Sequence, residues 1–167
     1  ADTQMPWHEP AAIARAIQEG KDKGIDSVLL GGDISDSYQL SKFWRRPDKA
    51  IFVRERYALE EFFETLREQF PNARIVWKYG NHDVHLERYM STHAPVLYDE
   101  DINNWQEVLK LQDYGVEVIE DYRKVYLGKL LFVHGHEFGQ SMMPPVTPAR
   151  WLFLRANCVD MCAHHQQ

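Results

Sequence analysis

The chain has 167 residues and a formal net charge of -6, with 44% hydrophobic and 26% charged residues. This is the size and composition of one globular domain. The negative net charge argues against a protein that binds nucleic acid over its whole surface. No stretch reaches the roughly 20 apolar residues that cross a membrane. Cys158 and Cys162 do not form a CxxC pair, and we expect reduced, buried thiols, which suit a cytoplasmic protein.

The first half of the chain predicts two helices and one strand. Residues 10–23 begin with a proline and carry apolar side chains at helical spacing, which is typical of a helix. Residues 25–30 form a short apolar run that predicts a buried strand ending at two glycines. Residues 49–70 predict the longest helix, which Pro71 ends. Its core-facing stripe consists of Phe52, Leu59, Phe62, Phe63, Leu66 and Phe70.

The second half alternates between strand and helix signals. Residues 73–78 predict a second apolar strand, and residues 84–90 and 103–112 predict helices. Three further strands are predicted in 116–136, the last two joined by a hairpin turn at Gly128. Residues 147–157 predict a helix and 158–163 a final short strand. This alternation is typical of an α/β domain.

Polar side chains collect just after four of the predicted strands. They are Asp33 and Asp36 in GGDISD, Asn81, His82 and Asp83 in YGNHD, His134 and His136 in VHGHEF, and His164 in AHHQQ. Strand ends in open α/β sheets converge on one crevice, so distant loops can bring these groups together. Carboxylate and amide oxygens with neutral imidazole are ligands for divalent metals, and burying such groups is costly unless they are paired or bound. The sequence therefore predicts a metal site.

In this order the motifs resemble the calcineurin-like metallophosphoesterases, whose pattern is D-x-H, G-D-x-x-D, G-N-H-D/E, H-G-H and G-H-x-H. The chain has DTQ at 2–4, GDISD at 32–36, GNHD at 80–83, HGH at 134–136 and AHHQ at 163–166. The phage-type members are the more similar, because of PWHEP after the first motif and ARWLFLRAN before the last. The resemblance implies an α/β sandwich of mixed sheets flanked by helices.

The resemblance also implies roles. Asp33 would bridge two divalent cations, Asp2 would belong to the first site, and the second site would be completed by Asn81, His134 and His164. His82 would be the general acid or a phosphate contact, oriented by Asp36. For Asp36 the alternative is an N-cap of a helix after it. Asp83, with a turn or supporting role as its alternative, and His136 are secondary candidates.

Two family histidines are replaced by glutamine, at Gln4 and Gln166, and both would bind the first cation. One interpretation is a first site retuned to Asp2, Gln4, Asp33 and Gln166; the other is a broken first site. A carbonyl oxygen is a harder and weaker ligand than imidazole nitrogen, so we expect weaker binding and a preference for manganese, with magnesium, iron, zinc and nickel as alternatives. A register shifted by one residue, to His165 and Gln167, is also open.

The expected function is hydrolysis of a phosphomonoester or phosphodiester by a metal-activated water at a dinuclear site. The alternatives are a nuclease and a silent domain that binds phosphate or a nucleotide. FWRRPDKAIFVRER, residues 43–56, carries Arg45, Arg46, Arg54 and Arg56. These arginines either guide a nucleotide or nucleic-acid substrate or belong to a solvated loop before the helix, and the exposure of Trp44 bears on the choice.

By comparison with the family pattern, we expect residues 1–167 to be one domain and a fragment that lacks the first strand and the last strands. We expect it in the cytoplasm of a bacterium or of a phage-infected cell. The oligomeric state is left open.

Overall fold

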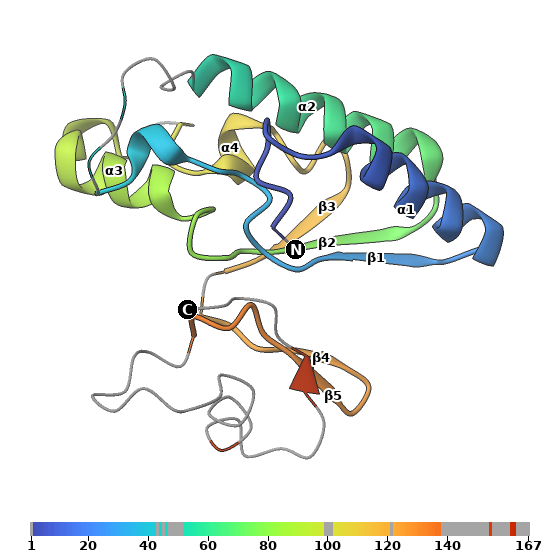
Figure 1. Cartoon of the computed structure of the whole chain (residues 1–167). Helices are drawn as coiled ribbons and strands as arrows, with labels where there is room; N and C mark the ends of the chain where they lie inside the picture. Colours follow the sequence, from blue (N-terminus) through green and yellow to red (C-terminus); the bar gives the residue numbers. More distant parts are fainter. Residues whose placement is uncertain are drawn as a thin grey trace.

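A computed structural model describes residues 2–42, 44, 46, 52–98, 102–120, 122–137, 154 and 161–162. The predicted helix over 147–157, apart from Leu154, lies outside these ranges, as do Arg45, His164 and Gln166. In the described part, helices cover one face of a parallel sheet and a second sheet lies on its other side (Figure 1). The predicted α/β fold with mixed sheets is thereby confirmed.

The first sheet is parallel and has the order β1-β2-β3. Its strands are β1 (Ser27–Leu30), β2 (Arg74–Lys78) and β3 (Val116–Ile119). The chain passes from β1 to β2 through the 3-10 turn η1 (Tyr38–Leu40) and helix α2 (Phe52–Gln69), and from β2 to β3 through α3 (His85–His93), η3 (Pro95–Leu97) and α4 (Trp105–Val108). All three strands therefore end at the same edge, where we expected the polar motifs to meet.

Two helices form the layer above this sheet (Figure 1). Helix α1 (Pro10–Lys23) starts where the Glu9 side chain accepts a hydrogen bond from the Ala11 N–H, and it ends at Gly24, whose φ of 59° is left-handed. The apolar stripe of α2 is buried as predicted: Leu59 and Phe63 are fully covered, and Phe63 lies 5.2 Å from the Trp77 ring of β2. Burying each such side chain contributes about 1.5–3 kcal/mol.

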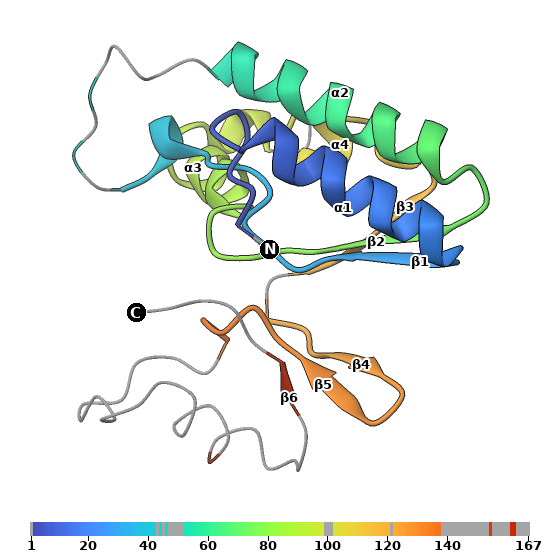
Figure 2. The ribbon, with the colours of Figure 1, turned by 45° about the vertical axis from the view of Figure 1, so that its right-hand side comes forward.

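The second sheet has the order β4-β5-β6, with β4 (Val125–Leu127) antiparallel and β6 (Met161–Cys162) parallel to β5 (Leu130–Phe132) (Figure 2). Side chains alternate along β2, so Ile75 and Trp77 join the helical core while Val76 and Lys78 point to the other face. Among the described residues, no helix has the length and apolar character required to span a membrane.

Among the element boundaries that differ from the sequence expectation, two have a clear physical reason. The helix predicted over 103–112 is limited to α4, because Lys110 takes a left-handed φ of 49° and the chain then turns through Gly115. The strand predicted from Ile25 begins at Ser27, because the Ile25 N–H is still bonded to the Gly20 carbonyl at the end of α1.

A glutamate in the first turn of α2 is buried rather than solvated. Glu55 is 2% exposed and accepts hydrogen bonds from the Ser37 N–H at 2.7 Å and from Gln39 Nε2 at 2.9 Å. Burial raises the pKa of Glu55 to about 7, since these hydrogen bonds only partly offset it and Asp36 adds repulsion.

Replacing Glu55 by Gln is expected to stabilise the protein at high pH only. The unfolded carboxyl loses its proton near pH 4.5, whereas the folded one keeps it until about pH 7, so the wild type loses stability as pH rises through this window. The neutral amide avoids that loss. In urea unfolding with chelator, the gain should grow from nothing at pH 4.5 to about 1–3 kcal/mol at pH 8. Equal gains at both pH values, or the same profile for exposed Glu61→Gln, would contradict the reasoning.

Candidate metal centre

The N-terminal segment lies beside the loop that follows β1. The Asp2 N–H donates to the Gly32 carbonyl at 2.9 Å, and the Gln4 N–H donates to the Asp33 carbonyl at 3.1 Å. Met5 and Ser35 form a parallel bridge just beyond. These contacts bring the first two motifs together at the carboxyl edge of the parallel sheet.

Two glycines allow the other motifs to approach equally closely. A Cβ on Gly32 would lie 2.5 Å from His134 Nδ1 and 3.0 Å from the Gly80 Cα, so the three loops touch at this point. A Cβ on Gly80 would collide with Asp33 Oδ1. Any larger residue at either position would push a predicted metal ligand away, which is the physical need for glycine in GGD and in GNHD.

The buried pair of Asp33 and His134 occupies the centre of the cluster. Asp33 is 1% exposed and His134 is fully buried, with Asp33 Oδ2 3.3 Å from His134 Nε2. His134 Nδ1 lies 3.0 Å from the Gly31 carbonyl, so this nitrogen carries the proton and Nε2 presents its lone pair. A backbone carbonyl that fixes the tautomer in this way is typical of a metal-binding histidine.

Asp33 and His134 influence each other's ionisation. Burial favours the neutral form of Asp33, but the hydrogen bond and charge of His134 outweigh it and keep the pKa of Asp33 below its usual value. Burial likewise opposes charge on His134, yet the hydrogen bond that Asp33 accepts from the protonated ring, together with the charges of Asp33 and Asp2, raises the pKa of His134. A divalent cation between these groups would take over the role of the imidazolium proton.

The side chains of Asp2, Asp33 and His134 each offer a ligand atom, and these atoms lie within 4.8 Å of one another. Asp2, Gln4 and Asp33 have positive φ values of 53°, 45° and 50°. For residues with a Cβ this left-handed backbone is unfavourable, typically by about 1–3 kcal/mol each, and such residues cluster at functional sites. The fold thus holds Asp2, Gln4 and Asp33 in strained backbone positions close to where the side chains of Asp2, Asp33 and His134 gather.

Asn81 supplies an independent sign of a missing ligand. Its Oδ1 is buried and has no hydrogen-bond partner among the residues that the structure describes. A buried carbonyl oxygen left unpaired costs roughly 1–3 kcal/mol, so a partner such as a cation is expected. Together with two carboxylates and an imidazole, this donor set fits a divalent ion with mixed oxygen and nitrogen ligands.

His82 lies at the solvent side of this cluster. Its backbone N–H donates to Asp33 Oδ1 at 2.9 Å, its Nδ1 lies 2.7 Å from the Asp36 carbonyl oxygen, and its Nε2 lies 4.0 Å from Asp33 Oδ2. The side chain is 30% exposed, so it can reach a substrate. The Asp36 carbonyl fixes the proton on Nδ1 and turns Nε2 toward the metal ligands.

Asp36 is not a helix N-cap, because η1 begins at Tyr38 and Ser37 occupies the cap position. Its carboxylate lies 3.8 Å from His82 Nδ1 and accepts a hydrogen bond from Trp7 Nε1 at 3.0 Å. The orienting role expected for Asp36 is therefore compatible with its position.

Asp83 is buried beside the predicted ligands, and its carboxylate accepts hydrogen bonds from groups of the protein. It accepts hydrogen bonds from the N–H groups of Asp33, Ser35 and Gly80 and from Trp77 Nε1 and Ser35 Oγ, all at 2.8–3.2 Å. Burial and the charge of Asp33 nevertheless raise the pKa of Asp83. Asp83 thus joins the GGD and GNHD loops, in agreement with the supporting alternative.

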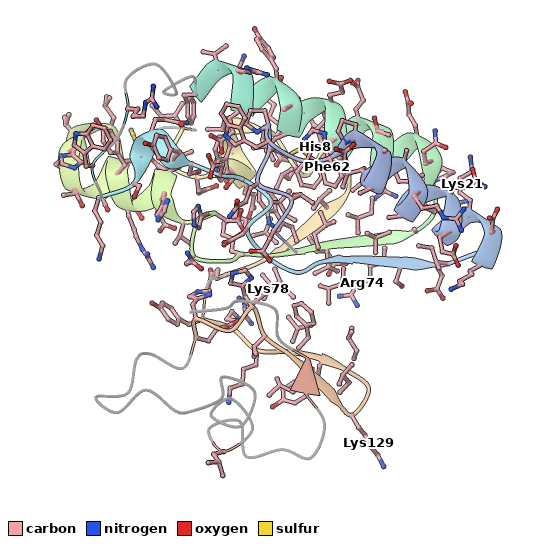
Figure 3. All side chains as sticks on the ribbon, in the orientation of Figure 1. His8, Lys21, Phe62, Arg74, Lys78 and Lys129 are labelled. Carbon is pink, nitrogen blue, oxygen red and sulfur yellow. The ribbon has the colours of Figure 1, made fainter. Side chains whose placement is uncertain are left out.

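One pair of residues at the site was missed by the sequence reasoning. Glu137 accepts hydrogen bonds from the N–H groups of His134 and Gly135 at 2.8 and 2.7 Å, and its Oε1 lies 3.2 Å from Lys78 Nζ. Both side chains are almost completely buried, and Figure 3 shows Lys78 where the parallel sheet faces the β4–β5 hairpin. The ion pair ties β2 to the HGH loop. The available signal was a lysine directly after the apolar run Ile75–Trp77 of β2.

His136 and His85 are also close to the ligands. The His136 ring lies 5.2 Å from that of His134 and 5.6 Å from that of Tyr122. The His85 ring lies 5.0 Å from that of His82. Burial, reinforced by His82 and Arg88, lowers the pKa of His85 to about 4, so it is neutral near pH 7.

The arginines of segment 43–56 point to different surroundings. Arg46 is exposed and its N–H donates to the Tyr38 hydroxyl at 3.0 Å, while neighbouring Trp44 is 81% exposed. Arg54 lies over the Trp7 ring at 5.5 Å, and Arg56 lies over the Tyr57 ring at 5.0 Å. Arg54 is thus joined, through Trp7, to Asp36.

Two further arginines line a cavity of about 530 Å³ beyond the ends of β2 and β3. Arg88 and Arg123 face this space together with Glu87 and Glu120. The charges balance, so the cavity has no net attraction for a phosphate group.

The comparisons with known proteins agree with this geometry. The family model of the calcineurin-like phosphoesterases matches residues 1–165. No curated protein and no solved structure matches the chain significantly.

Proposed function

Because the chain belongs to the calcineurin-like phosphoesterase family, we propose that it hydrolyses a phosphate ester at a site for two divalent cations. The observation that carries this proposal is the meeting of Asp2, Asp33 and His134 from three distant motifs. The unpaired oxygen of Asn81 supports it independently.

The proposed ligands divide between two cations. Asp33 would serve both; Asp2, Gln4 and Gln166 would help to hold the first, and Asn81, His134 and His164 would help to hold the second. Cations bound there supply a water of lowered pKa and neutralise the phosphoryl oxygens. Manganese suits the carbonyl oxygens of the two glutamines, and we expect the first site to be the weaker one.

The protein groups then have separate tasks. Hydrolysis forms one bond from a water oxygen to phosphorus and breaks the bond from phosphorus to the ester oxygen. His82, as an imidazolium, gives its Nε2 proton to that departing oxygen, while the Asp36 carbonyl 2.7 Å from Nδ1 keeps the ring in place. Lys78 and Glu137 hold the HGH loop, and Asp83 holds the loops of Asp33 and Asn81.

Metal content and hydrolysis together test the proposal. Mass spectrometry of the manganese-loaded protein should find between one and two ions per chain. The same sample should hydrolyse 4-nitrophenyl phosphate or bis(4-nitrophenyl) phosphate, and chelator should abolish the activity. Fewer than one ion and no turnover with any metal would overturn it in favour of a silent domain. Diester cleavage together with degradation of DNA would identify the enzyme as a nuclease.

A further inference from the structure

Trp7 is a large aromatic side chain that the fold keeps at the surface. It is 54% exposed, whereas Trp77 and Trp105 are fully buried. Its indole N–H is bonded to Asp36 Oδ2 at 3.0 Å, and the guanidinium of Arg54 lies over its ring at 5.5 Å. These two polar contacts fix an apolar ring in contact with water, which is how aromatic anchors of binding sites are presented.

Asp36 links the ring to the proton donor of the proposed reaction. Asp36 contacts Trp7 through its carboxylate and His82 through its backbone carbonyl, at 3.0 and 2.7 Å respectively. Since His82 faces the oxygen that leaves phosphorus, Trp7 lies on the side of the leaving group. This step rests on the proposed function.

We propose that Trp7 forms the subsite for the leaving group, and that this group is a nucleoside whose base stacks on the indole ring. Arg54, which lies over the ring at 5.5 Å, adds a positive charge to this subsite. In a nucleoside monophosphate, water supplies the new oxygen on phosphorus, the bond to the nucleoside oxygen breaks, and that oxygen takes its proton from His82. The products are inorganic phosphate and the nucleoside.

Stacking of a base on an aromatic side chain contributes about 1–3 kcal/mol, which corresponds to roughly 5- to 150-fold in specificity. A nucleoside is therefore preferred over a leaving group that has the same sugar and no base. The two cases are represented by adenosine 5′-monophosphate and ribose 5-phosphate, which share the ester bond that breaks.

The test is the ratio of kcat/KM for these two substrates, measured with manganese-loaded enzyme. We expect wild type to favour the nucleotide, Trp7→Ala to lower the ratio roughly 5- to 100-fold, and Trp7→Phe to retain most of it. Both substitutions also remove the hydrogen bond from the indole to Asp36, but this loss changes kcat/KM equally for the two substrates and therefore leaves their ratio unchanged. Tyr57→Ala is the matched control, because Tyr57 is 57% exposed and also lies beneath an arginine of α2. Its ratio should stay that of wild type.

An unchanged ratio in Trp7→Ala, in an enzyme that still hydrolyses 4-nitrophenyl phosphate, would overturn the subsite and leave the proposed function standing. If wild type hydrolyses no ester, the proposed function fails; calorimetry of the same two ligands then decides the subsite, and equal affinities in wild type and Trp7→Ala would overturn it. A 5′-phosphorylated single-stranded DNA 10-mer shows whether the bound nucleoside belongs to a free nucleotide or to a nucleic acid. A higher kcat/KM for the 10-mer than for the mononucleotide would support the subsite as one for nucleic acid, and a lower one would support it as one for free nucleotides.

Discussion

Replacement of His82 by Ala is expected to lower kcat by roughly 100- to 10,000-fold while the metal content stays close to that of wild type. The imidazole is the proposed proton donor, and its Nε2 is directed toward Asp33. The hydrogen bond that His82 makes to Asp33 Oδ1 comes from the backbone N–H and persists in alanine. The metal ligands should therefore keep their arrangement.

Comparing two substrates tests the proton-donor role of His82 directly. An alkyl phosphate needs a proton on its departing oxygen, whereas 4-nitrophenolate leaves readily without one. The deficit of His82→Ala should accordingly be larger for the alkyl ester. His93→Ala, an exposed histidine at the end of α3, is the control and should behave as wild type. Loss of bound manganese in His82→Ala, or equal deficits for the two esters, would remove His82 from the role of general acid.

Replacement of Asp33 by Asn should weaken manganese binding at least about 100-fold and abolish measurable turnover. Asp33 offers a ligand atom within 4.8 Å of those of Asp2 and His134, and it carries the charge that the proposed cations would share. The amide removes this charge. Its NH₂ group would also replace one of the two carboxylate oxygens, which now lie beside the His82 N–H and His134 Nε2, and would leave one of these groups without its oxygen partner.

Calorimetric titration with manganese measures this effect directly, and circular dichroism reports whether the variant is folded. Asp26→Asn offers a matched control, since Asp26 precedes β1 whereas Asp33 follows it, and Asp26 is exposed. We expect its manganese affinity to equal that of wild type. An Asp33→Asn protein that binds manganese as tightly as wild type would show that the carboxylate is not at the centre of the site.

The interior of the helical layer could be predicted because its signals are local. The spacing of Leu59, Phe62, Phe63 and Leu66 defines one face of α2, and that face is buried against the parallel sheet. Glu55 is an exception to this pattern. Its charge suggests solvent, but its position beside Ser37 and Gln39, 16–18 residues earlier, places it in the interior.

The candidate site was partly predictable for a topological reason. GGD and GNHD each follow a parallel strand, so their loops must reach the same edge of the sheet, and Asp33 and His82 are joined there by a hydrogen bond. The task of Asp83 was left open, because the sequence does not reveal how many donors surround a carboxylate. Five are present, from residues as far apart as Ser35 and Gly80.

The sequence by itself indicated a site for cations, since its acidic, amide and imidazole residues follow successive strands, and its resemblance to the calcineurin-like phosphoesterases indicated phosphate esters as substrates. It also determined most helices and strands, because the periodicity of apolar residues is a property of neighbours along the chain. Only the tertiary structure decided that Lys78 and Glu137 form a buried pair behind His134, and that Trp7 lies against Asp36. These contacts join residues 29 to 59 positions apart, and their energies depend on burial and direction, which no local pattern encodes.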